Sequence, residues 1–324
     1  MRQTERRTVL LLPGQGAQYP RMAAELYREQ AAFTAAMDEF FDACGRRGGE
    51  LRDDWLSAAP RVPIDDVTRA QPLLFAVNLA IGRALTDAGR PVDALLGHSV
   101  GELAAAALAG VFSPADGAEL MCRRADAARL MPPGGMLAVA ATPDELAPHL
   151  SGGPGGELGG VVVGAWNAPR QCIVSGPDPA LEAAEETLRG KGFMCRRVRA
   201  LQPFHSPVLR PAAEELVRCL EGMRLSPPRV PVRSCRTGRW VTDEEAVTPE
   251  FWALQLAEPV LFWPALDGLL TDRPEGGWTL VEACLSQLAP LARRHRAVAR
   301  GGAEVITIGP GEFPMTASVR RSGS

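Results

Sequence analysis

The sequence of 324 residues has one lysine, Lys191, so nearly all of its basic side chains are arginines. Lys191 lies in Leu-Arg-Gly-Lys-Gly-Phe, which lacks the Gly-x-x-x-x-Gly-Lys-Ser/Thr spacing of a phosphate-binding loop. We therefore expect neither Schiff-base chemistry nor a phosphate loop. The formal net charge of −3 gives no excess of positive charge for phosphate contacts, so nucleic acid is not an expected partner.

Paired cysteines and long apolar runs are also missing. The seven cysteines are scattered and include no Cys-x-x-Cys pair, which argues against a zinc site or a disulfide framework. No apolar run is long enough for a membrane span, and residues 9–12 are too few for the core of a signal peptide. We expect a cytoplasmic monomer, with no bound metal or cofactor and no membrane partner. The 46% hydrophobic content predicts a packed core.

Short apolar runs alternate with helical periodicity in the first third of the chain. Runs at 8–12 and 94–96 are typical of buried parallel strands, and helical spacing covers 22–44, 72–88 and 102–109. Strands that alternate with helices in this way predict an α/β fold, a parallel sheet with helices on both faces.

A change in composition begins at Pro-Pro-Gly-Gly, residues 132–135. The strands expected after it are at 136–141, 161–165, 171–175 and 193–198, the helices at 143–150 and 179–190, and a glycine-rich turn region at 151–160. The order βαββαβ is the ferredoxin-like pattern. We therefore predict a hydrolase-like large domain, 1–133 and 201–324, with an inserted ferredoxin-like α+β subdomain at 134–200.

The large domain resumes with further helices and strands. Helices are expected at 208–223, 249–256, 259–270 and 290–299, an extended segment at 230–234, strands at 279–283 and 304–308, and a frayed polar tail at the C-terminus.

Gly-His-Ser-Val-Gly, residues 97–101, fits the nucleophile elbow Gly-x-Ser-x-Gly. It follows an apolar run and precedes an alanine-rich helix, as an elbow should. The turn would project the hydroxyl of Ser99 above the sheet, and the amide of Val100 would lie at a helix N-terminus, where developing negative charge is stabilised.

A serine nucleophile needs a base, and the chain has only four histidines. His98 is adjacent to Ser99 in a tight turn, which favours a structural hydrogen bond beneath the elbow. His149 falls in the small subdomain, and His295 in Ala-Arg-Arg-His-Arg-Ala is expected on a solvated helix face. His205 lies in Gln-Pro-Phe-His-Ser-Pro, a loop with prolines on both sides that could present it to a cleft, so it is the predicted base.

These motifs, in this order, resemble the malonyl-coenzyme A:acyl-carrier-protein transacylase family, including the acyltransferase domains of polyketide synthases and their free-standing relatives. The resemblance covers nearly the whole chain. Matching stretches include Pro-Gly-Gln-Gly-Ala-Gln at 13–18, Gln-Pro-Leu-Leu at 71–74, Gly-His-Ser-Val-Gly-Glu at 97–102, Met-Cys-Arg-Arg at 121–124, Trp-Asn-Ala-Pro at 166–169, Val-Ser-Gly at 174–176 and Phe-His-Ser-Pro at 204–207, and several in order are far more specific than any one alone.

The resemblance implies a role for each matching residue. Ser99 would be acylated and His205 would be its base. The backbone amides of Gln15 and Val100 would form the oxyanion hole. Arg124 would pair with the free carboxylate of a dicarboxylic acyl group, because a guanidinium fork holds both oxygens; without the resemblance, an ordinary surface arginine is the alternative.

Further roles implied by the resemblance concern the surroundings of the base and the acyl group. The main-chain carbonyl of Gln255 would orient His205, which would explain why no acidic third member stands out. Gln71 and Asn167 would line the pocket. The donor would be a coenzyme A thioester, and the acceptor the phosphopantetheine thiol of an acyl carrier protein.

The resemblance also bears on which acyl group is used. Val100 after the serine and Phe204 before the histidine accompany unsubstituted malonyl groups in the family, and a bulky Phe204 would fill the space that an α-methyl needs. The departures from the family pattern are Pro203, Cys235, Ala125 and Ala-Cys-Leu at 283–285, where alanine, asparagine, glycine and Val/Ile-Gly-Pro are usual.

Two other functions stay open. The departures could mark a specialised enzyme that moves an acyl or aminoacyl unit between two carrier proteins. An esterase or thioesterase is the other, although it would need an acidic residue and a late histidine, and the His-Gly-Gly-Gly oxyanion loop is absent. Arginines at 196, 197 and 199 and at 293, 294, 296 and 300 could meet an acidic carrier protein or simply face solvent.

Overall fold

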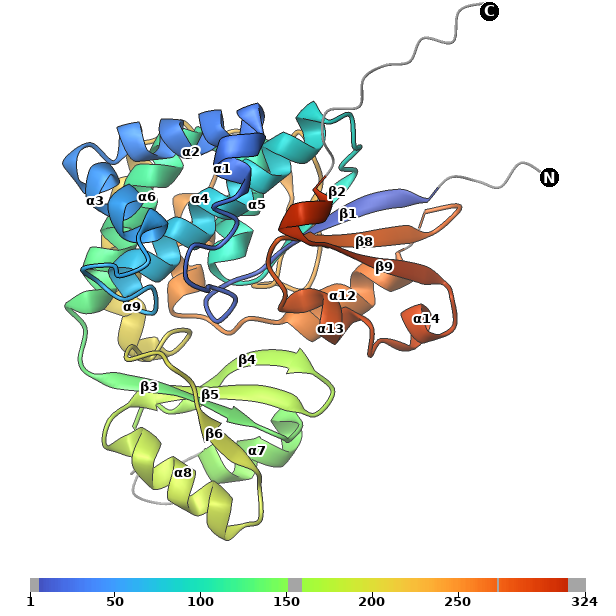
Figure 1. Ribbon diagram of the computed structural model, residues 1–324. Coiled ribbons are helices and arrows are strands. Elements are labelled where there is room, and N and C mark those ends of the chain that lie inside the picture. The colour runs from blue at the N-terminus through green and yellow to red at the C-terminus, as the bar shows by residue number, and fades with distance from the viewer. Residues whose placement is uncertain (1–5, 151–158, 273, 314–324) are drawn as a thin grey trace, which may run out of the picture.

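The computed structural model describes residues 6–150, 159–272 and 274–313 (Figure 1). Most of the expected turn region at 151–160 and the expected frayed tail lie outside these residues. Within them, no helix combines the length and the apolar character needed to cross a membrane.

A five-stranded parallel sheet forms the centre of the larger part, in the order β7-β2-β1-β8-β9. Its strands are β1 (Arg7–Leu12), β2 (Ala94–Gly97), β7 (Val232–Arg233), β8 (Trp278–Ala283) and β9 (Ala303–Ile308). Leu12 lies opposite Gly97 in the register of β1 and β2, so the loops that leave these neighbouring strands begin side by side.

Alternate residues of each strand face opposite layers of helices, since successive side chains of a strand point to opposite faces. Leu10 and Leu12 pack into one hydrophobic core, while Val9 and Leu11 pack into a second. The helices on the first side are α1 (Leu26–Glu29), α2 (Ala31–Ala43), α3 (Arg46–Leu56), α4 (Val67–Asp87), α5 (Val100–Ala109), α6 (Pro114–Arg129), α9 (Arg210–Glu221), α10 (Asp243–Ala246) and α11 (Pro249–Ala253). Those on the second side are α12 (Phe262–Thr271), α13 (Leu288–Ala292) and α14 (Arg296–Ala299).

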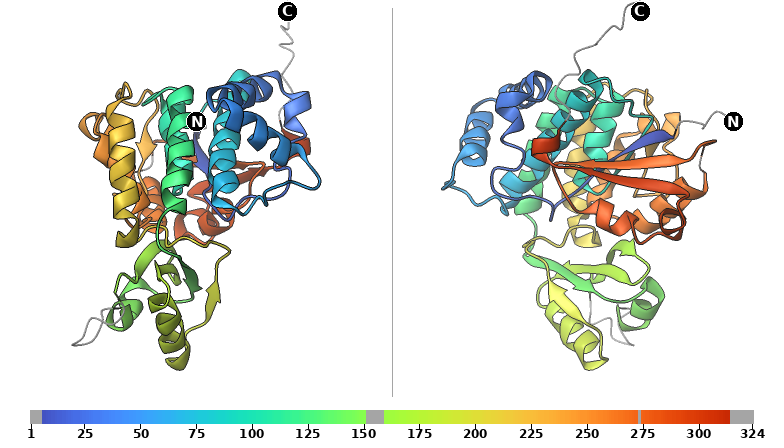
Figure 2. Two further views of the ribbon diagram at one scale, coloured as in Figure 1. Left: turned by 90° about the vertical axis from the view of Figure 1, so that its left-hand side faces the viewer. Right: turned by 45° about the vertical axis from the view of Figure 1, so that its right-hand side comes forward.

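A second, antiparallel sheet lies apart from the large one, with its two helices on the face that points away from the larger part (Figures 1 and 2). Its elements are β3 (Gly134–Val139), α7 (Pro143–Leu150), β4 (Val162–Ala168), β5 (Gln171–Pro177), α8 (Ala180–Gly190) and β6 (Cys195–Arg197). The strand order β4-β5-β3-β6 is that of a ferredoxin-like sheet.

The predicted fold class, an α/β parallel sheet with a ferredoxin-like insertion, is therefore confirmed. The exact boundaries at 134 and 200 stay a prediction. Short 3₁₀ helices η1 (Pro207–Leu209), η2 (Leu254–Leu256) and η3 (Pro310–Glu312) complete the described elements.

Several predicted helices differ from the observed ones. The segment 22–44 is not one helix, because Gln30 is extended between α1 and α2. The helix expected at 72–88 begins earlier, at Val67, where the Asp66 side chain accepts from the backbone N–H of Thr68. Helices α3 and α6 were not predicted.

The prediction of a single arginine-rich helix at 290–299 is wrong, because the structure has two short helices, α13 and α14, in this region. The chain turns at His295, whose side chain caps α14 by accepting from the backbone N–H of Ala297. His295 is only 3% exposed and its Nε2 lies 2.9 Å from an Asp267 carboxylate oxygen, so the expectation of a solvated helix face is wrong as well.

Candidate active site

The elbow predicted at 97–101 forms the turn between β2 and α5. Ser99 has φ of 53° and ψ of −119°, a left-handed conformation that L residues seldom adopt outside constrained sites. A Cβ on Gly97 would lie 2.3 Å from the carbonyl carbon of Gly101, and a Cβ on Gly101 would lie 1.9 Å from the carbonyl oxygen of Leu12. Only glycine at both positions allows the turn to be this tight beside the end of β1.

Ser99 and His205 lie in contact, although 106 positions separate them in the chain. The Oγ of Ser99 is 2.8 Å from Nε2 of His205, and both residues are buried. His205 itself has φ of 61°, so the backbone is left-handed on both sides of this contact. The predicted nucleophile and base are thus brought together by two constrained loops.

The other imidazole nitrogen faces two main-chain carbonyls. The Nδ1 of His205 is 3.0 Å from the oxygen of Gln255 and 3.0 Å from the oxygen of Glu258. Because carbonyl oxygens can only accept, Nδ1 must carry the hydrogen, which leaves Nε2 of the neutral ring free to accept from the Ser99 hydroxyl. Gln255 was predicted for this place, whereas Glu258 was missed.

Burial keeps His205 neutral. Loss of solvation lowers its pKa to about 3, and the nearby positive charge of Arg124 and a smaller contribution from His98 act in the same direction. At neutral pH the ring is therefore unprotonated and able to accept a proton.

Gln255 contacts both members of the pair. Its side-chain Nε2 donates to the main-chain oxygen of Ser99 at 2.7 Å, and it also lies 3.4 Å from a carboxylate oxygen of Glu102. Glu102 is 1% exposed, and burial raises the pKa of its carboxyl to about 7. Hydrogen bonds from Ser234 and Gln255 lower this pKa, but their effect is smaller than that of burial. Sequence reasoning gave Glu102 no role, although it follows the elbow directly.

The amide proposed for the oxyanion hole at Gln15 lies in the loop after β1. Within 6–150, 159–272 and 274–313, no acceptor contacts the backbone N–H of Gln15. The loop is held by Gln287, whose Oε1 accepts from the Gly14 amide at 3.1 Å and whose Nε2 donates to the Gln15 oxygen at 3.3 Å. The amide of Val100 is at the first position of α5, where a helix leaves N–H groups without intrahelical partners.

Gln287 is itself placed by a buried carboxylate that the sequence did not reveal. Glu282, near the end of β8, accepts from the backbone N–H groups of Gln287, Leu288 and Ala289 at 2.9, 2.8 and 2.8 Å. Strands β1, β2 and β8 are neighbours in the sheet, so the loops that follow them meet at one edge.

Arg124 is completely buried in α6, not an ordinary surface arginine. Its Nε donates to Oε1 of Gln71 at 2.9 Å, and Nε2 of Gln71 donates to Oε1 of Gln15 at 3.0 Å. Both terminal nitrogens of Arg124 lack a partner among the described residues. Desolvation lowers its pKa to about 9, so the guanidinium remains charged at neutral pH.

The other predicted pocket residues lie close to these groups. Asn167, on β4, has its Oδ1 2.8 Å from Nε2 of His98. His98 thus makes the structural hydrogen bond that its position suggested. Phe204 is 3% exposed, and its main-chain oxygen accepts from the Ser175 hydroxyl at 2.6 Å, which fixes the backbone before His205.

A separate surface hollow of about 850 Å³ contains none of the predicted site residues. It includes Ala107, near the C-terminal end of α5 and about 12 Å along the helix from Ser99 at the usual rise of about 1.5 Å per residue. The pair Ser99 and His205 therefore does not line this hollow.

Comparison with known proteins agrees with this geometry. Residues 9–283 match the family model described as the acyl transferase domain. One component of the phenolphthiocerol/phthiocerol polyketide synthase of Mycobacterium tuberculosis is 34% identical over 272 residues, which cover 82% of this chain and 18% of that protein. The spectinabilin polyketide synthase system protein NorB of Streptomyces orinoci is 34% identical over 82% of this chain and 12% of its own length.

Solved structures show the same fold. The acyltransferase domain from the second module of the salinomycin polyketide synthase aligns with a TM-score of 0.83 and 31% identity, over 96% of this chain and 71% of that one. The acyl transferase domain of SpnD, in complex with 2-(pent-4-yn-1-yl)malonyl, aligns with a TM-score of 0.84 and 30% identity, over 96% and 75%. The chain spans less than a fifth of the two curated relatives named above but most of these isolated domains. It belongs to the acyl transferase domain family, and the prediction of an acyltransferase is confirmed.

Proposed function

We propose that the protein transfers a malonyl-type acyl group from a coenzyme A thioester, through an ester on Ser99, to the phosphopantetheine thiol of an acyl carrier protein in polyketide synthesis. The observation that carries the choice of a carboxylated acyl group is the buried Arg124, whose two terminal nitrogens have no partner in the described part of the chain. A guanidinium in this state gains most from an anion that can bind both nitrogens together.

In the first half-reaction, Oγ of Ser99 attacks the thioester carbonyl while its proton moves to Nε2 of His205, 2.8 Å away. The amides of Gln15 and Val100 stabilise the oxyanion of the tetrahedral intermediate. When the carbon–sulfur bond breaks, the leaving thiolate takes the proton back from the imidazolium. The products are coenzyme A and acyl-Ser99, and His205 is neutral again.

The second half-reaction runs the same steps with a different thiol. The phosphopantetheine thiol gives its proton to Nε2 of His205 as its sulfur attacks the ester carbonyl. The carbon–oxygen bond then breaks, and Ser99 recovers its proton from the imidazolium. One base serves both halves because the carbonyls of Gln255 and Glu258 hold Nδ1–H in place and stabilise the imidazolium each time it forms.

The residues next to the catalytic pair favour an unsubstituted malonyl group. Phe204 is almost fully buried beside His205, and Val100 is fully buried after Ser99. We infer that both limit the space beside Ser99 for a substituent on the acyl chain. The SpnD domain, a relative at 30% identity, is found with 2-(pent-4-yn-1-yl)malonyl, a substituted malonyl group, which supports a malonyl-type group but does not bear on the preference for an unsubstituted one.

The test is acylation by a panel of coenzyme A thioesters, read by intact mass and by mapping of the modified peptide. We expect malonyl-coenzyme A to modify Ser99 and acetyl-coenzyme A to do so more slowly. Ser99→Ala should remain unmodified, and His205→Gln, which leaves the hydroxyl, should react far more slowly. Modification by acetyl- and malonyl-coenzyme A at equal rates would overturn the role given to Arg124.

Transfer between two carrier proteins is a second candidate, favoured by one departure from the family pattern. Cys284 stands where the family usually has glycine and has φ of 60°, a conformation that glycine adopts far more readily. Its main-chain oxygen accepts from the Tyr19 hydroxyl at 3.0 Å, at the end of β8 next to the oxyanion loop. If no coenzyme A thioester acylates Ser99 but an acyl carrier protein thioester does, this candidate replaces the first.

A further inference from the structure

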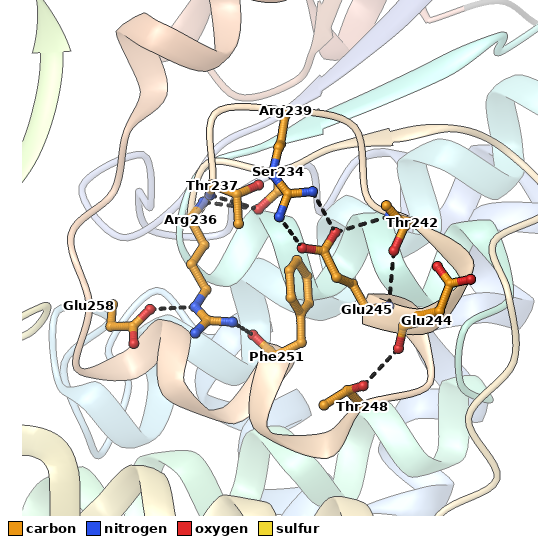
Figure 3. Close-up of polar contacts among 10 residues, drawn as sticks. All are labelled: Ser234, Arg236, Thr237, Arg239, Thr242, Glu244, Glu245, Thr248, Phe251 and Glu258. Carbon is orange, nitrogen blue, oxygen red and sulfur yellow. Dashed lines mark hydrogen bonds and ion pairs between the residues drawn. The ribbon is translucent and has the colours of Figure 1, made fainter.

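Arg236 lies in a loop after β7 whose backbone is closely fixed by its own side chains (Figure 3). The Ser234 hydroxyl accepts from the backbone N–H of Arg236 at 3.0 Å and from that of Thr237 at 3.3 Å. Thr242 and Glu245 form a capping box at the start of α10, and Arg239 makes an ion pair with Glu245. The two hydrogen bonds to Ser234 fix the backbone from which the Arg236 side chain extends, whereas the Arg239–Glu245 pair lies farther along the loop.

The guanidinium of Arg236 joins three groups on the segment 251–258. Its Nε donates to the Glu258 carboxylate, and its Nη1 donates to the main-chain oxygen of Phe251 at 3.2 Å. It also lies over the Phe251 ring, 5.2 Å from the centroid. The side chain of Arg236 is 18% exposed and that of Glu258 is 37% exposed, so this ion pair is partly shielded from water.

Glu258 connects this ion pair to the base. Its main-chain oxygen is one of the two acceptors of Nδ1–H of His205, while its carboxylate is held by Arg236. Its own amide donates to the oxygen of Leu254 at 3.0 Å, so the residue is fixed at three points. The side chain and the carbonyl belong to the same residue, so an ion pair that holds the carboxylate also restrains the backbone that carries the carbonyl.

We propose that the Arg236–Glu258 ion pair positions the Glu258 carbonyl on Nδ1–H of His205, which makes Arg236 a positioning residue for the acyl transfer. This rests on the proposed function, and it adds a residue that does not touch the reacting atoms. Without the pair, the Glu258 carbonyl is held less firmly, and the orientation and tautomer of the imidazole depend mainly on the Gln255 carbonyl. Acylation then slows, while binding of the acyl donor is unaffected.

The charged and titratable groups that face His205 are Arg124 and His98, from α6 and the elbow. Arg236 also acts on Glu102, whose carboxyl pKa its charge helps to lower. Substitution of Arg236 therefore removes a positive charge from the region as well as a contact. Arg236→Lys keeps the positive charge, but an ammonium group cannot reproduce the planar guanidinium that donates to both Glu258 and the Phe251 oxygen. This variant therefore separates the loss of charge from the loss of hydrogen bonds.

The experiment compares Arg236→Ala, Arg236→Lys and Glu258→Gln with Arg239→Ala, which breaks an ion pair of the same loop that does not reach His205. For the first three we expect kcat for Ser99 acylation to fall about five- to tenfold at unchanged KM, as for loss of one hydrogen bond. The decrease in kcat should be smallest for Arg236→Lys, and the kcat of Arg239→Ala should equal that of the wild type. A wild-type kcat in both Arg236→Ala and Glu258→Gln would overturn the proposal.

A second readout needs no turnover. The ¹⁵N chemical shifts of the His205 ring, assigned by comparison with His205→Gln among only four histidines, report its tautomer. We expect the Nδ1–H form in the wild type and in Arg239→Ala, and a mixture in Arg236→Ala and Glu258→Gln. An unchanged tautomer in both variants contradicts the proposal. If wild-type Ser99 accepts no donor while these shifts behave as expected, the proposed function fails and the positioning role stands.

Discussion

The Gln255 side chain donates to the main-chain oxygen of Ser99 at 2.7 Å, while the main-chain oxygen of the same glutamine accepts from His205. Gln255 therefore contacts both the nucleophile and the base, and its two hydrogen bonds help to set the distance between them. The Ser99 carbonyl also accepts from the backbone N–H of Glu102 at 2.8 Å, so the Gln255 amide adds a second hydrogen bond to this buried oxygen.

Gln255→Met should lower both stability and acylation rate, because it removes the side-chain donor to this oxygen and keeps the volume. We expect the free energy of unfolding to fall by about 0.5–1.5 kcal/mol, the usual contribution of one hydrogen bond, because the Ser99 oxygen keeps the Glu102 N–H as a donor. Urea unfolding and the rate of Ser99 acylation provide the measurement. Gln171→Met, on the surface hairpin of the small sheet, serves as the control, and equal behaviour of the two variants would contradict the assignment.

Gly101→Ala should disrupt the elbow. Its Cβ would lie 1.9 Å from the Leu12 oxygen, a backbone atom that cannot move without displacing β1. We expect a loss of about 3 kcal/mol of stability or more, as for severe overpacking. Gly49→Ala is the matched control: nothing lies within 4 Å of its Cβ, and the position is inside α3, so it should stabilise by about 0.5–1 kcal/mol.

Arg124→Gln should change which acyl groups are accepted. Without the guanidinium, malonyl-coenzyme A loses its carboxylate partner, and we expect its kcat/KM to fall about 100-fold, as for loss of about 3 kcal/mol at a charged hydrogen-bonded pair. Acetyl-coenzyme A should be affected much less. Arg123→Gln, an exposed neighbour paired with Glu119, is the control. A uniform decrease for both donors would show that Arg124 acts on the fold and not on the acyl group.

Glu102 should give the stability a distinct pH dependence. Its pKa is about 7 in the folded chain, above the value near 4.5 of a free carboxyl, so the folded state binds the proton more tightly. Its favourable contribution is complete below pH 4.5 and is lost as pH rises through 7, by about 3 kcal/mol.

Glu102→Gln should remove this loss, so the difference in unfolding free energy between variant and wild type should move in favour of the variant from pH 4.5 to 8. Denaturant titrations at several pH values measure it, with the exposed Glu119→Gln as control. His205 acts in the opposite direction, since its lowered pKa makes stability fall as pH decreases below about 6.5. Using differences between variants cancels this contribution. A difference independent of pH would show that folding does not raise the pKa of Glu102.

The sequence was informative where the chemistry is local. The elbow was visible because Gly97, Ser99 and Gly101 must occur at fixed spacing between a strand and a helix. His205 could be selected because few histidines compete with it. The βαββαβ order of the small sheet was readable because its strands and helices follow each other at short range.

The remainder depends on contacts that no local pattern encodes. Helix α3 was missed because Gly48 and Gly49 are poor helix formers, yet Gly48 is required where a Cβ would lie 1.8 Å from the Phe41 oxygen in α2. The break at His295 follows from its bond to Asp267, which is distant in the chain. The Glu258 carbonyl has no signature at all, since every residue carries one.

The segment after Glu258 also joins the two sheets. The Val260 amide donates to the Gly164 oxygen at 2.9 Å, and the Trp166 amide donates to the Val260 oxygen at 2.8 Å, both on β4. The small sheet is thus anchored two residues from the carbonyl that contacts the imidazole. The orientation of the base therefore depends on both sheets, because β4 of the small sheet holds Val260 and the Glu258 carbonyl two residues earlier contacts Nδ1–H of His205.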